Sequence, residues 1–267
     1  MPTLTHNSPY IIIDFDSTFT KVEGLDELAA IALNGHADRN AIVEKITDLT
    51  NKGMNGEMSF AQGLRERIDL LKADRSHIAE LIDFLHSKVS DSFKRNQHFL
   101  TEYADQIFIV SSGFKDFIVP VVTALGIRAD HVYANEFVYD EEGNITGIDE
   151  SNVLSTDGGK IKLLQSLNLE GEVYAIGDGY TDYELKKSGL ADRFYAFTEN
   201  VERPRVTAVA DHIATSFDDF LYDNKFTRSQ SYPKSRIKVL LLENVHPAAL
   251  RAFEEQGFNV EFVKGAL

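Results

Sequence analysis

Residues 10–18 read YIIIDFDST, an apolar run that ends in two carboxylates, Asp14 and Asp16. Four consecutive apolar residues bounded by charge predict a short buried strand over residues 10–13. Carboxyl groups two residues apart point the same way on an extended backbone, so we expect these two to share one site. This stretch therefore predicts a strand with acid groups directly after it.

Two later runs repeat the arrangement of a buried strand followed by polar residues. Residues 107–110 (IFIV) precede Ser111, and residues 173–176 (VYAI) precede Asp178. Helical patterns separate these strands, which indicates an α/β fold with a parallel sheet core and helices on both faces. Ligands bind beyond the carboxyl ends of the strands in such sheets, which is where these polar residues are expected.

The connecting segments are predicted from periodicity and turn residues. A helix is expected from about Phe114 to Leu125, a β-hairpin over residues 133–149, and a helix opened by Gly158 and Gly159. Residues 24–105 carry apolar residues at helical spacing in three stripes: Ile42, Ile46 and Leu49; Phe60, Leu64, Ile68 and Leu71; Ile78, Leu81, Ile82 and Leu85. We interpret this segment as a helical insertion that caps the site.

The predicted domain organisation follows from these patterns and from a polar, proline-containing stretch near the C-terminus. It has four parts: an α/β core of residues 1–23 and 106–223, a helical cap of residues 24–105, a linker of residues 224–235, and a βαβ-like unit of residues 236–267.

Composition narrows the class of protein. The 267 residues include no cysteine, which excludes disulfides, thiolate metal sites and a cysteine nucleophile. The net charge of −15 argues against nucleic-acid binding, because an acidic protein repels phosphate backbones. No apolar run approaches the roughly 20 residues that cross a bilayer, and the first nine residues lack the pattern of a secretory signal. We therefore expect a cytoplasmic protein that does not bind membranes.

The polar residues after the strands suit phosphoryl chemistry. Crowded carboxylates require a cation, and oxygen-only ligands favour Mg²⁺. Asp14 can act as a nucleophile that forms an aspartyl phosphate, while the Lys160 ammonium and the Ser111 hydroxyl can bind phosphate oxygens. The carboxylates expected to converge are Asp14, Asp16, Asp178 and Asp182.

Each of these residues has a simpler interpretation when it is taken alone. Acidic pairs after a strand are commonly helix caps or turn formers, and Ser111 and Asp178 lie in sequences typical of turns. Lys160 alone is a solvated surface lysine. The ordered set, with each member at a strand end or a helix start, favours a catalytic site.

The combination of DFDST (14–18), Ser111, Lys160 and GDGYTD (177–182) resembles the four motifs of the haloacid dehalogenase superfamily of phosphatases, in the same order. The resemblance covers about residues 10–220 and implies a Rossmann-like α/β core with an inserted helical cap. It also implies that Asp14 is the nucleophile. Its partner Asp16 would protonate the leaving alcohol and then activate water.

The same resemblance implies the metal and phosphate ligands. Asp14, Asp178 and a backbone carbonyl in the Phe15–Asp16 region, assigned to Phe15, would hold Mg²⁺. Thr181 and Asp182 would lie next to these ligands without binding the metal directly. Asp182 would either hold a ligand in place or reach the metal through water. The transferring phosphate would be bound by Ser111 and Lys160.

Within the superfamily the chain is most similar to the phosphoserine phosphatase group. DFDSTFTKVEGLDELA (14–29) resembles that group's opening and MNGEMSFAQGLRERIDLL (54–71) its cap pattern. Carried over, Glu23 would meet the substrate ammonium and Arg67 its carboxylate. Taken alone, Glu23 is a helix N-terminal charge and Arg67 an i,i+4 surface partner. The residues expected to line the pocket and exclude water are Met54 and Phe60.

Two positions depart from the group's usual pattern. Ser112 and Gly113 follow the motif serine where the group often has two glycines, so Ser112 either adds a hydroxyl near the substrate or occupies a turn. Both are counted as substrate-binding candidates. Thr181 stands where some members carry asparagine and others threonine.

The tail RIKVLLLENVHPAALRAFEEQGFNVEFVKGAL (236–267) resembles the beginning of D-3-phosphoglycerate dehydrogenases. It predicts a strand over residues 237–242, a helix over roughly 247–256 and a strand over 259–263. Because it has no G-x-G-x-x-G motif, this piece cannot hold a dinucleotide by itself. We expect the chain to be the front of a phosphatase–dehydrogenase fusion; the alternative is a βαβ appendage that packs on the core.

The predicted function is Mg²⁺-dependent hydrolysis of L-phosphoserine to L-serine and phosphate through an aspartyl phosphate, a step of serine biosynthesis. Two alternatives stay open. One is a phosphotransferase or a phosphatase for another small phosphate ester, and the other is a non-catalytic domain that regulates a fused dehydrogenase. The full set of Asp14, Asp16, Ser111, Lys160 and Asp178 argues against the non-catalytic domain.

Overall fold

In a computed structural model, the apolar run near the N-terminus forms strand β1 (Tyr10–Ile13) at the centre of a parallel sheet. The structure describes residues 8–54, 57–229, 237–242 and 245–263. The chain divides into two units, Met1–Thr227 and Arg228–Leu267.

The sheet of the first unit confirms the predicted α/β fold with a parallel core. Within the described residues it has six strands in the order β3-β2-β1-β6-β7-β8, and every neighbouring pair is parallel. The five strands beside β1 are β2 (Ile107–Phe114), β3 (Val132–Asn135), β6 (Val173–Gly177), β7 (Arg193–Phe197) and β8 (His212–Ala214). Since β1 lies between β2 and β6, the three predicted strands have adjacent carboxyl ends.

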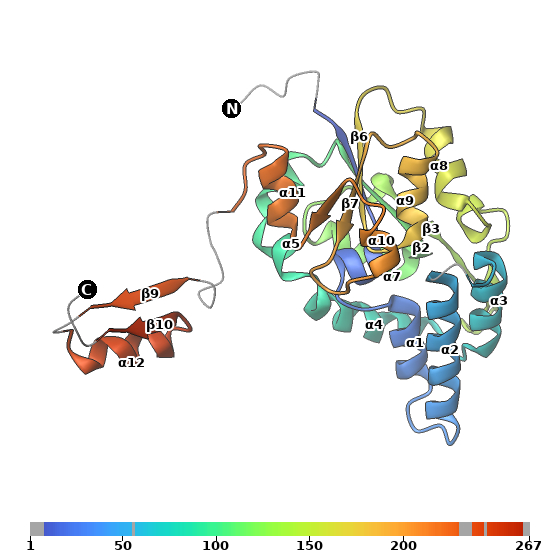
Figure 1. The fold of residues 1–267 in the computed structure, drawn as a ribbon. Coiled ribbons are helices and arrows are strands. Elements are labelled where there is room, and N and C mark those ends of the chain that lie inside the picture. The colour runs from blue at the N-terminus through green and yellow to red at the C-terminus, as the bar shows by residue number, and fades with distance from the viewer. Residues whose placement is uncertain (1–7, 55–56, 230–236, 243–244, 264–267) are drawn as a thin grey trace. The chain divides into compact units, whose positions relative to one another are not determined.

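Helices cover both faces of this sheet (Figure 1). Side chains alternate along β1, so Ile11 and Ile13 pack on one face and Ile12 on the other. The helices of the first unit are α1 (Gly24–Ala32), α2 (Arg39–Met54), α3 (Phe60–Leu70), α4 (Arg75–Lys88), α5 (Asp91–Arg95), α6 (Gln97–Glu102), α7 (Lys115–Thr123), α8 (Gly159–Leu167), α9 (Tyr180–Lys187), α10 (Pro204–Thr207) and α11 (Phe217–Asp223).

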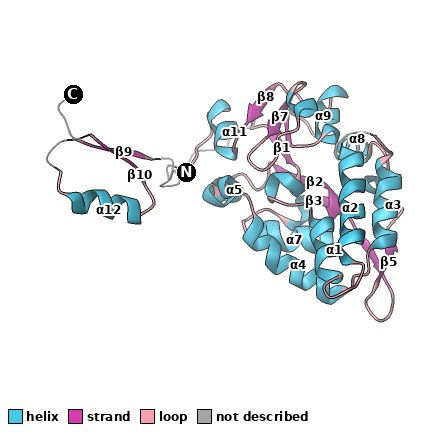
Figure 2. Cartoon of the chain, turned by 60° about the horizontal axis from the view of Figure 1, so that its bottom comes forward, coloured by secondary structure: helices cyan, strands magenta, loops and turns pink. Residues whose placement is uncertain are grey.

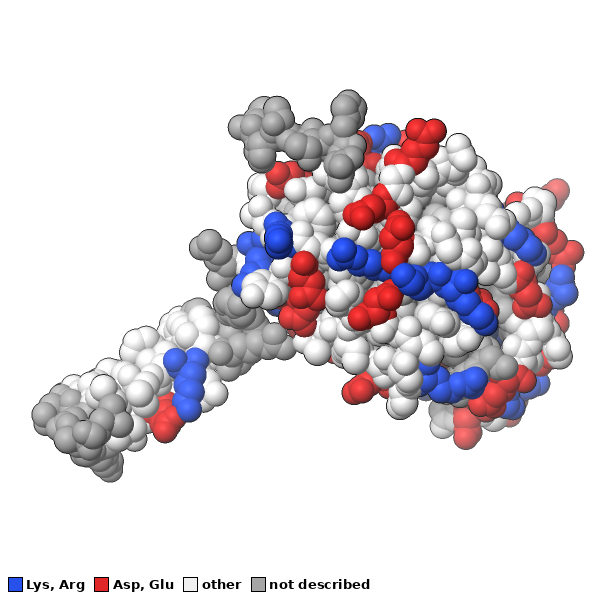
Figure 3. All heavy atoms as spheres, turned by 45° about the horizontal axis from the view of Figure 1, so that its top comes forward, with Lys and Arg blue, Asp and Glu red and all other residues white. Residues whose placement is uncertain are grey.

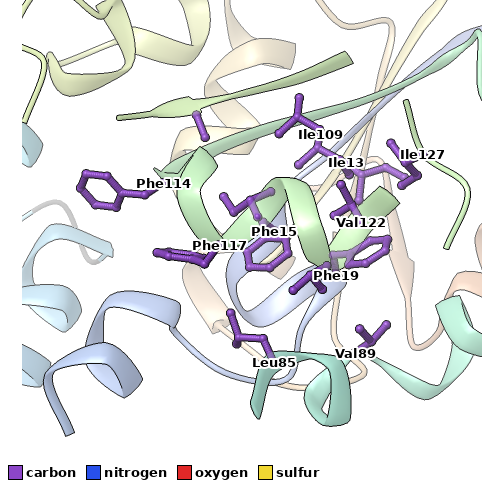
Figure 4. Close-up of a cluster of buried hydrophobic side chains, with 14 of the residues drawn as sticks. Ile13, Phe15, Phe19, Leu85, Val89, Ile109, Phe114, Phe117, Val122 and Ile127 are labelled. Carbon is purple, nitrogen blue, oxygen red and sulfur yellow. The ribbon is translucent and has the colours of Figure 1, made fainter. Parts of the chain in front are cut away.

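The core on the α7 face is largely aromatic. Phe15, Phe19 and Phe117 lie together below the sheet, next to Ile13 (Figure 4). Phe93 of α5 extends this cluster, because its ring centroid lies 4.8 Å from that of Phe19. Since Phe15 lies between the two carboxylates and Phe19 ends the turn after β1, this packing fixes the turn.

The segment predicted as a cap divides between two environments. Helices α1, α2 and α3 lie side by side (Figure 2), and α2 and α3 contribute residues to the pocket described below. By contrast, Phe93 of α5 stacks on Phe217 of α11, and Arg95 and Asn96 donate hydrogen bonds to Asp218. Residues 91–102 therefore belong with the core rather than with the cap predicted over 24–105, and we place the end of the cap near Val89.

The predicted hairpin over residues 133–149 is wrong at its first strand. Residues 132–135 form β3, which pairs in parallel with β2, and the hairpin consists of β4 (Phe137–Tyr139) and β5 (Ile145–Ile148). The glutamate-rich turn between β4 and β5 is the feature that the sequence pattern located.

Strand β2 runs four residues beyond the predicted strand. It includes Ser111, Ser112 and Gly113, and its pairing with β3 is interrupted between Val110 and Phe114. An interrupted ladder of this kind redirects side chains, and such features occur next to active sites. Helix α7 consequently begins at Lys115 rather than at Phe114.

The second unit consists of β9 (Lys238–Leu241), α12 (Pro247–Glu255) and β10 (Asn259–Phe262). The two strands are parallel, with Val239 opposite Val260, so the order strand–helix–strand forms a βαβ unit. The first unit extends through Thr227, because Phe226 packs on Phe99 and Tyr103, so the linker begins later than residue 224. Residues 230–235 of the predicted linker lie outside the described residues.

On the face drawn in Figure 3, acidic and basic side chains lie intermingled. Among the described residues, no helix combines the length and the apolar character that a bilayer crossing requires.

Replacing Phe93 by alanine tests the aromatic packing. Because Phe93 is fully buried and stacks on Phe19 and Phe217, F93A is expected to lower the free energy of unfolding by about 3–5 kcal/mol, measured by urea denaturation. The control Ile213→Ala, at a position 53% exposed, should change it by less than about 1 kcal/mol. A similar effect of both variants would contradict the assigned core.

Candidate active site

The acidic turn after β1 forms one wall of the site. Asp14 and Asp16 both have extended backbone conformations, as the sequence pattern required, and both line one pocket. The turn is closed by Ser17, a non-glycine residue in the left-handed region with φ of +53°. The Ser17 hydroxyl donates a hydrogen bond to Glu23 Oε1 at 2.6 Å, which ties the turn to the start of α1.

Lys160 bonds to two of the acidic residues, Asp14 after β1 and Asp182 on α9. Its ammonium donates to Asp14 Oδ1 at 2.8 Å and to Asp182 Oδ1 at 2.6 Å, and all three side chains are buried. Lys160 reaches this position from the first turn of α8, and Asp182 from the first turn of α9. The lysine is therefore an internal counter-ion of the acid cluster, and the interpretation of Lys160 as a surface residue is wrong.

Asp178 completes the cluster from the end of β6. Its Oδ1 accepts a hydrogen bond from the Thr18 hydroxyl at 3.2 Å, and its Oδ2 accepts one from Arg203 Nε at 2.8 Å. Oxygen atoms of Asp14, Asp178 and Asp182 lie within 4.8 Å of one another. Three buried carboxylates this close fit a hard divalent cation, because like charges at this spacing require neutralisation.

Burial dominates the ionisation of these acids. It raises the pKa of Asp178 to about 7, with the charges of Glu23 and Asp14 adding to the shift and Arg203 opposing it. For Asp182, burial and Asp14 raise the pKa while Lys160 lowers it. Burial alone would lower the pKa of Lys160, but Asp14 and Asp182 more than offset it, so the lysine stays charged. The acids of this cluster thus outnumber Lys160 and Arg203, the basic side chains that bond to them.

Asp16 is placed to carry a proton. Burial raises its pKa to about 7, against a hydrogen bond of 2.7 Å that the Gly24 N–H donates to Oδ1, and the charge of Asp14 raises it further. A carboxyl group with a pKa near the working pH can both donate and accept a proton during a reaction.

The β2 end approaches the Asp16 carboxyl closely. Ser111 is buried, and its Oγ accepts a hydrogen bond from the Gly113 N–H at 2.9 Å. A Cβ atom added at Gly113 would lie 2.9 Å from Asp16 Oδ2 and 3.2 Å from Ser111 Oγ. A side chain at this position would displace the Asp16 carboxyl, so glycine permits the close approach of Asp16 to β2.

A pocket with about 500 Å³ of space, its mouth included, opens between the core and the cap helices. The core wall is built from Asp14, Asp16, Ser111, Ser112, Lys160 and Thr181, and the cap wall from Leu49, Thr50, Gly53, Phe60, Gly63 and Arg67. Carboxylates and cations therefore lie at the core end, and apolar groups with one guanidinium lie at the cap end. This polarity suits a small molecule with an anionic group at each end.

Most sequence-predicted residues meet at this pocket. The predicted residues that do not line it are Phe15, Glu23, Gly113, Asp178 and Asp182. Asp182 bonds to Lys160, Asp178 accepts hydrogen bonds from Thr18 and Arg203, and the Glu23 carboxylate contacts Ser17 and lies 3.8 Å from Arg203. Met54 is the last residue of α2, and its side chain lies outside the described residues.

Several residues of the site were not predicted. Thr18 and Arg203 hold Asp178, and Thr50 contacts Arg67. The Asn200 amide donates to the backbone carbonyl oxygens of Ser17, Thr18 and Thr20, which fixes the acidic turn. Thr18 lies inside a quoted motif and could have been found there. The other three contact the site from positions that carry no local pattern.

A contact from the core also fixes the entrance of the pocket. Asp157 accepts hydrogen bonds from the Ser59 hydroxyl at 2.7 Å and from the Ala61 N–H at 3.2 Å, at the N-terminus of α3. The carboxylate thus caps a helix of the cap domain while lying three residues before Lys160.

Known proteins with similar sequences identify the family of the chain. Residues 11–187 match the haloacid dehalogenase-like hydrolase family. The chain is 31% identical over 215 residues to the chloroplastic phosphoserine phosphatase of Arabidopsis thaliana, which covers 79% of this chain and 70% of that protein. It is 30% identical over 221 residues to the phosphoserine phosphatase of Homo sapiens, covering 82% of this chain and 94% of that protein.

A solved structure shares the fold. The crystal structure of a phosphoserine phosphohydrolase-like protein from Francisella tularensis superposes with a TM-score of 0.72 and 28% sequence identity. The match covers 80% of this chain and 99% of that one.

Substituting Gly113 tests the close approach to Asp16. In G113A the added methyl group would displace the Asp16 carboxyl, so turnover of a phosphate ester is expected to fall about 10–100-fold while the melting temperature changes little. The matched control is Gly147→Ala, where an added Cβ meets open space and activity should be retained. Full turnover by G113A would show that Asp16 does not need this geometry.

Proposed function

We propose that this chain, which belongs to the haloacid dehalogenase-like hydrolase family, hydrolyses L-phosphoserine to L-serine and inorganic phosphate. The observation that carries the proposal is the buried Asp14–Lys160–Asp182 arrangement at one end of a pocket whose other end holds Arg67. Relatives named phosphoserine phosphatase, about 30% identical over about 80% of the chain, support the choice of substrate.

The proposed reaction has two phosphoryl-transfer steps. In the first, an Asp14 oxygen bonds to phosphorus as the bond to the serine oxygen breaks, and Asp16 gives its proton to that oxygen. In the second, a water oxygen bonds to phosphorus, the Asp14–phosphorus bond breaks, and Asp16 accepts a proton from the water. The raised pKa of Asp16, near 7, suits both roles.

The other residues of the pocket bind the substrate. We assign the phosphate to the Lys160 ammonium and the Ser111 hydroxyl, with Ser112 beside them. Arg67 would bind the carboxylate, and Phe60 would cover the substrate from the first turn of α3. The predicted partner of the substrate ammonium, Glu23, is a proposal supported by its place at the start of α1, next to the acidic turn.

We propose that Mg²⁺ is the cofactor. Asp14 and Asp178 would hold it, and its charge would neutralise the phosphate and the carboxylates. The Phe15 carbonyl already accepts hydrogen bonds from the N–H and hydroxyl of Thr20, so we favour the neighbouring Asp16 carbonyl as the backbone ligand. Asp182 would act behind these ligands by holding Lys160, with Thr181 at the pocket wall.

The role of the second unit is a further proposal. A βαβ unit with parallel strands is consistent with the predicted start of a dehydrogenase-type domain, and we propose a fused or associated phosphoglycerate dehydrogenase as its context. The cytoplasmic location expected from the sequence stays a prediction.

Removing the nucleophile tests the reaction. Asp14→Asn should lower phosphate release from L-phosphoserine at least 1,000-fold, because an amide oxygen cannot form the acyl phosphate, and the circular dichroism spectrum should not change. The exposed control Asp130→Asn should keep wild-type turnover. Appreciable hydrolysis by D14N, or no hydrolysis of phosphoserine by the wild type, would overturn the proposed function.

Mg²⁺ should stabilise the protein in a pH-dependent manner. Since burial raises the pKa of Asp178 from 3.8 to about 7, the folded state binds more protons than the unfolded state between these values. The free energy of unfolding of the metal-free protein should therefore fall as pH rises through this window. At pH 8, Mg²⁺ at about 100 times its Kd should raise the melting temperature by about 5–10 °C, and at pH 5 by less.

The variant Asp178→Asn provides the control for this measurement. It should lose the Mg²⁺-dependent rise in melting temperature, whereas Asp130→Asn should keep it. An equal rise at both pH values, or a full rise in D178N, would reject Asp178 as a metal ligand.

A further inference from the structure

The Arg67 guanidinium is held by neighbours that the proposed reaction does not use. Its Nη1 donates to the Thr50 hydroxyl at 3.1 Å, and its Nε donates to the Gly63 carbonyl, one turn earlier in α3, at 3.3 Å. Thr50 is only 5% exposed and lines the pocket from α2. The orientation of the guanidinium is therefore set by a neighbouring helix as well as by its own.

Thr50 is itself held from a third helix. Its hydroxyl lies 2.8 Å from Asp26 Oδ1 and 3.1 Å from the Ile46 carbonyl oxygen, two acceptors that compete for its single proton. Because that proton points to one of these acceptors, an oxygen lone pair is left to face Arg67. Asp26 is in turn fixed by Thr47, whose hydroxyl donates to Oδ2 at 2.9 Å.

Three helices of the cap thus meet in one polar chain, from Asp26 on α1 through Thr50 on α2 to Arg67 on α3. Burial lowers the pKa of Arg67, and the charges of Asp26, Glu23 and Asp16 oppose this shift. Asp26 therefore stabilises the buried cation without bonding to it directly. Among the described residues, no carboxylate bonds to the Arg67 guanidinium, so an incoming carboxylate can be bound bidentately.

We propose that Thr50, held by Asp26, is a positioning residue that sets the preference of this site for phosphate esters bearing a carboxylate. The inference rests on the proposed function and deepens it. A substrate with both a carboxylate and an ammonium would depend on Thr50, whereas an ester that carries only the ammonium would not. Thr50 acts through Arg67 and has no part in the chemical step.

The experiment compares KM for L-phosphoserine and for phosphoethanolamine, which lacks the carboxylate. Thr50→Val keeps the shape of the side chain but removes the acceptor of the Arg67 N–H. It is expected to raise KM for phosphoserine about tenfold, to leave KM for phosphoethanolamine within about twofold, and to leave kcat for both within about threefold. Arg67→Ala provides the benchmark, with the same selectivity and a larger effect.

Matched variants separate positioning from a general structural role. Thr50→Ser retains the hydroxyl and should keep most of the selectivity, whereas Thr50→Cys offers only a weak acceptor and should lose it. This pair also keeps the test available if T50V fails to fold. Thr47→Val removes the other threonine bond to Asp26 without touching Arg67, and should leave both KM values near those of the wild type.

The outcomes distinguish the two proposals. If the wild type hydrolyses phosphoserine and T50V raises KM for both substrates equally, or for neither, Thr50 does not position Arg67 and only the further inference fails. The same holds if T50S and T50C behave alike. If the wild type does not prefer phosphoserine to phosphoethanolamine, there is no carboxylate preference to set, and the proposed function fails together with the inference.

Discussion

The site depends on one buried ammonium group held between two carboxylates. Lys160 lies between Asp14 and Asp182, at 2.8 Å and 2.6 Å, in a place where none of the three charges is solvated. Removing a partner from such a buried arrangement leaves an uncompensated charge, which costs far more than an exposed ion pair is worth. The ends of β1, α8 and α9 are therefore fixed relative to one another, and the parallel sheet provides the frame that brings them together.

The charge balance of the site supports the proposal that it binds a divalent cation. Five acidic side chains, Asp14, Asp16, Glu23, Asp178 and Asp182, share the region with three basic ones, Lys160, Arg67 and Arg203. Burial holds several of these acids partly protonated near neutral pH in the protein alone. A divalent ion would supply two positive charges, the difference between five and three, and would let the acids ionise together.

Sequence alone located the core of the site because each core residue has a local signal. Asp14, Ser111 and Asp178 directly follow apolar runs, and Lys160 follows two glycines at a helix start. Strand β3 was predicted to be part of a hairpin because the sequence of a short strand does not indicate which strand it pairs with. Arg203 was missed for the same reason, since its function depends on a contact with Asp178, 25 residues away, that no periodicity encodes.

In the cap segment, too, local spacing predicted the helices but not their long-range contacts. Helical spacing predicted α2 and α3, but not that α5 would pack on the core, because Phe93 contacts Phe19, Phe197 and Phe217, which are all distant from it in the sequence.

The loop before α8 connects the core to the cap. Asp157 caps the N-terminus of α3 from the core, and three residues later Lys160 bonds to Asp14. Gly159, between them, is packed so tightly that an added Cβ would lie 2.5 Å from the Val153 carbonyl oxygen. A loop this constrained cannot move one end without the other, so the position of the helix that carries Phe60 and Arg67 is tied to the position of Lys160. The two ends of the pocket are therefore kept at the separation that one small substrate must span.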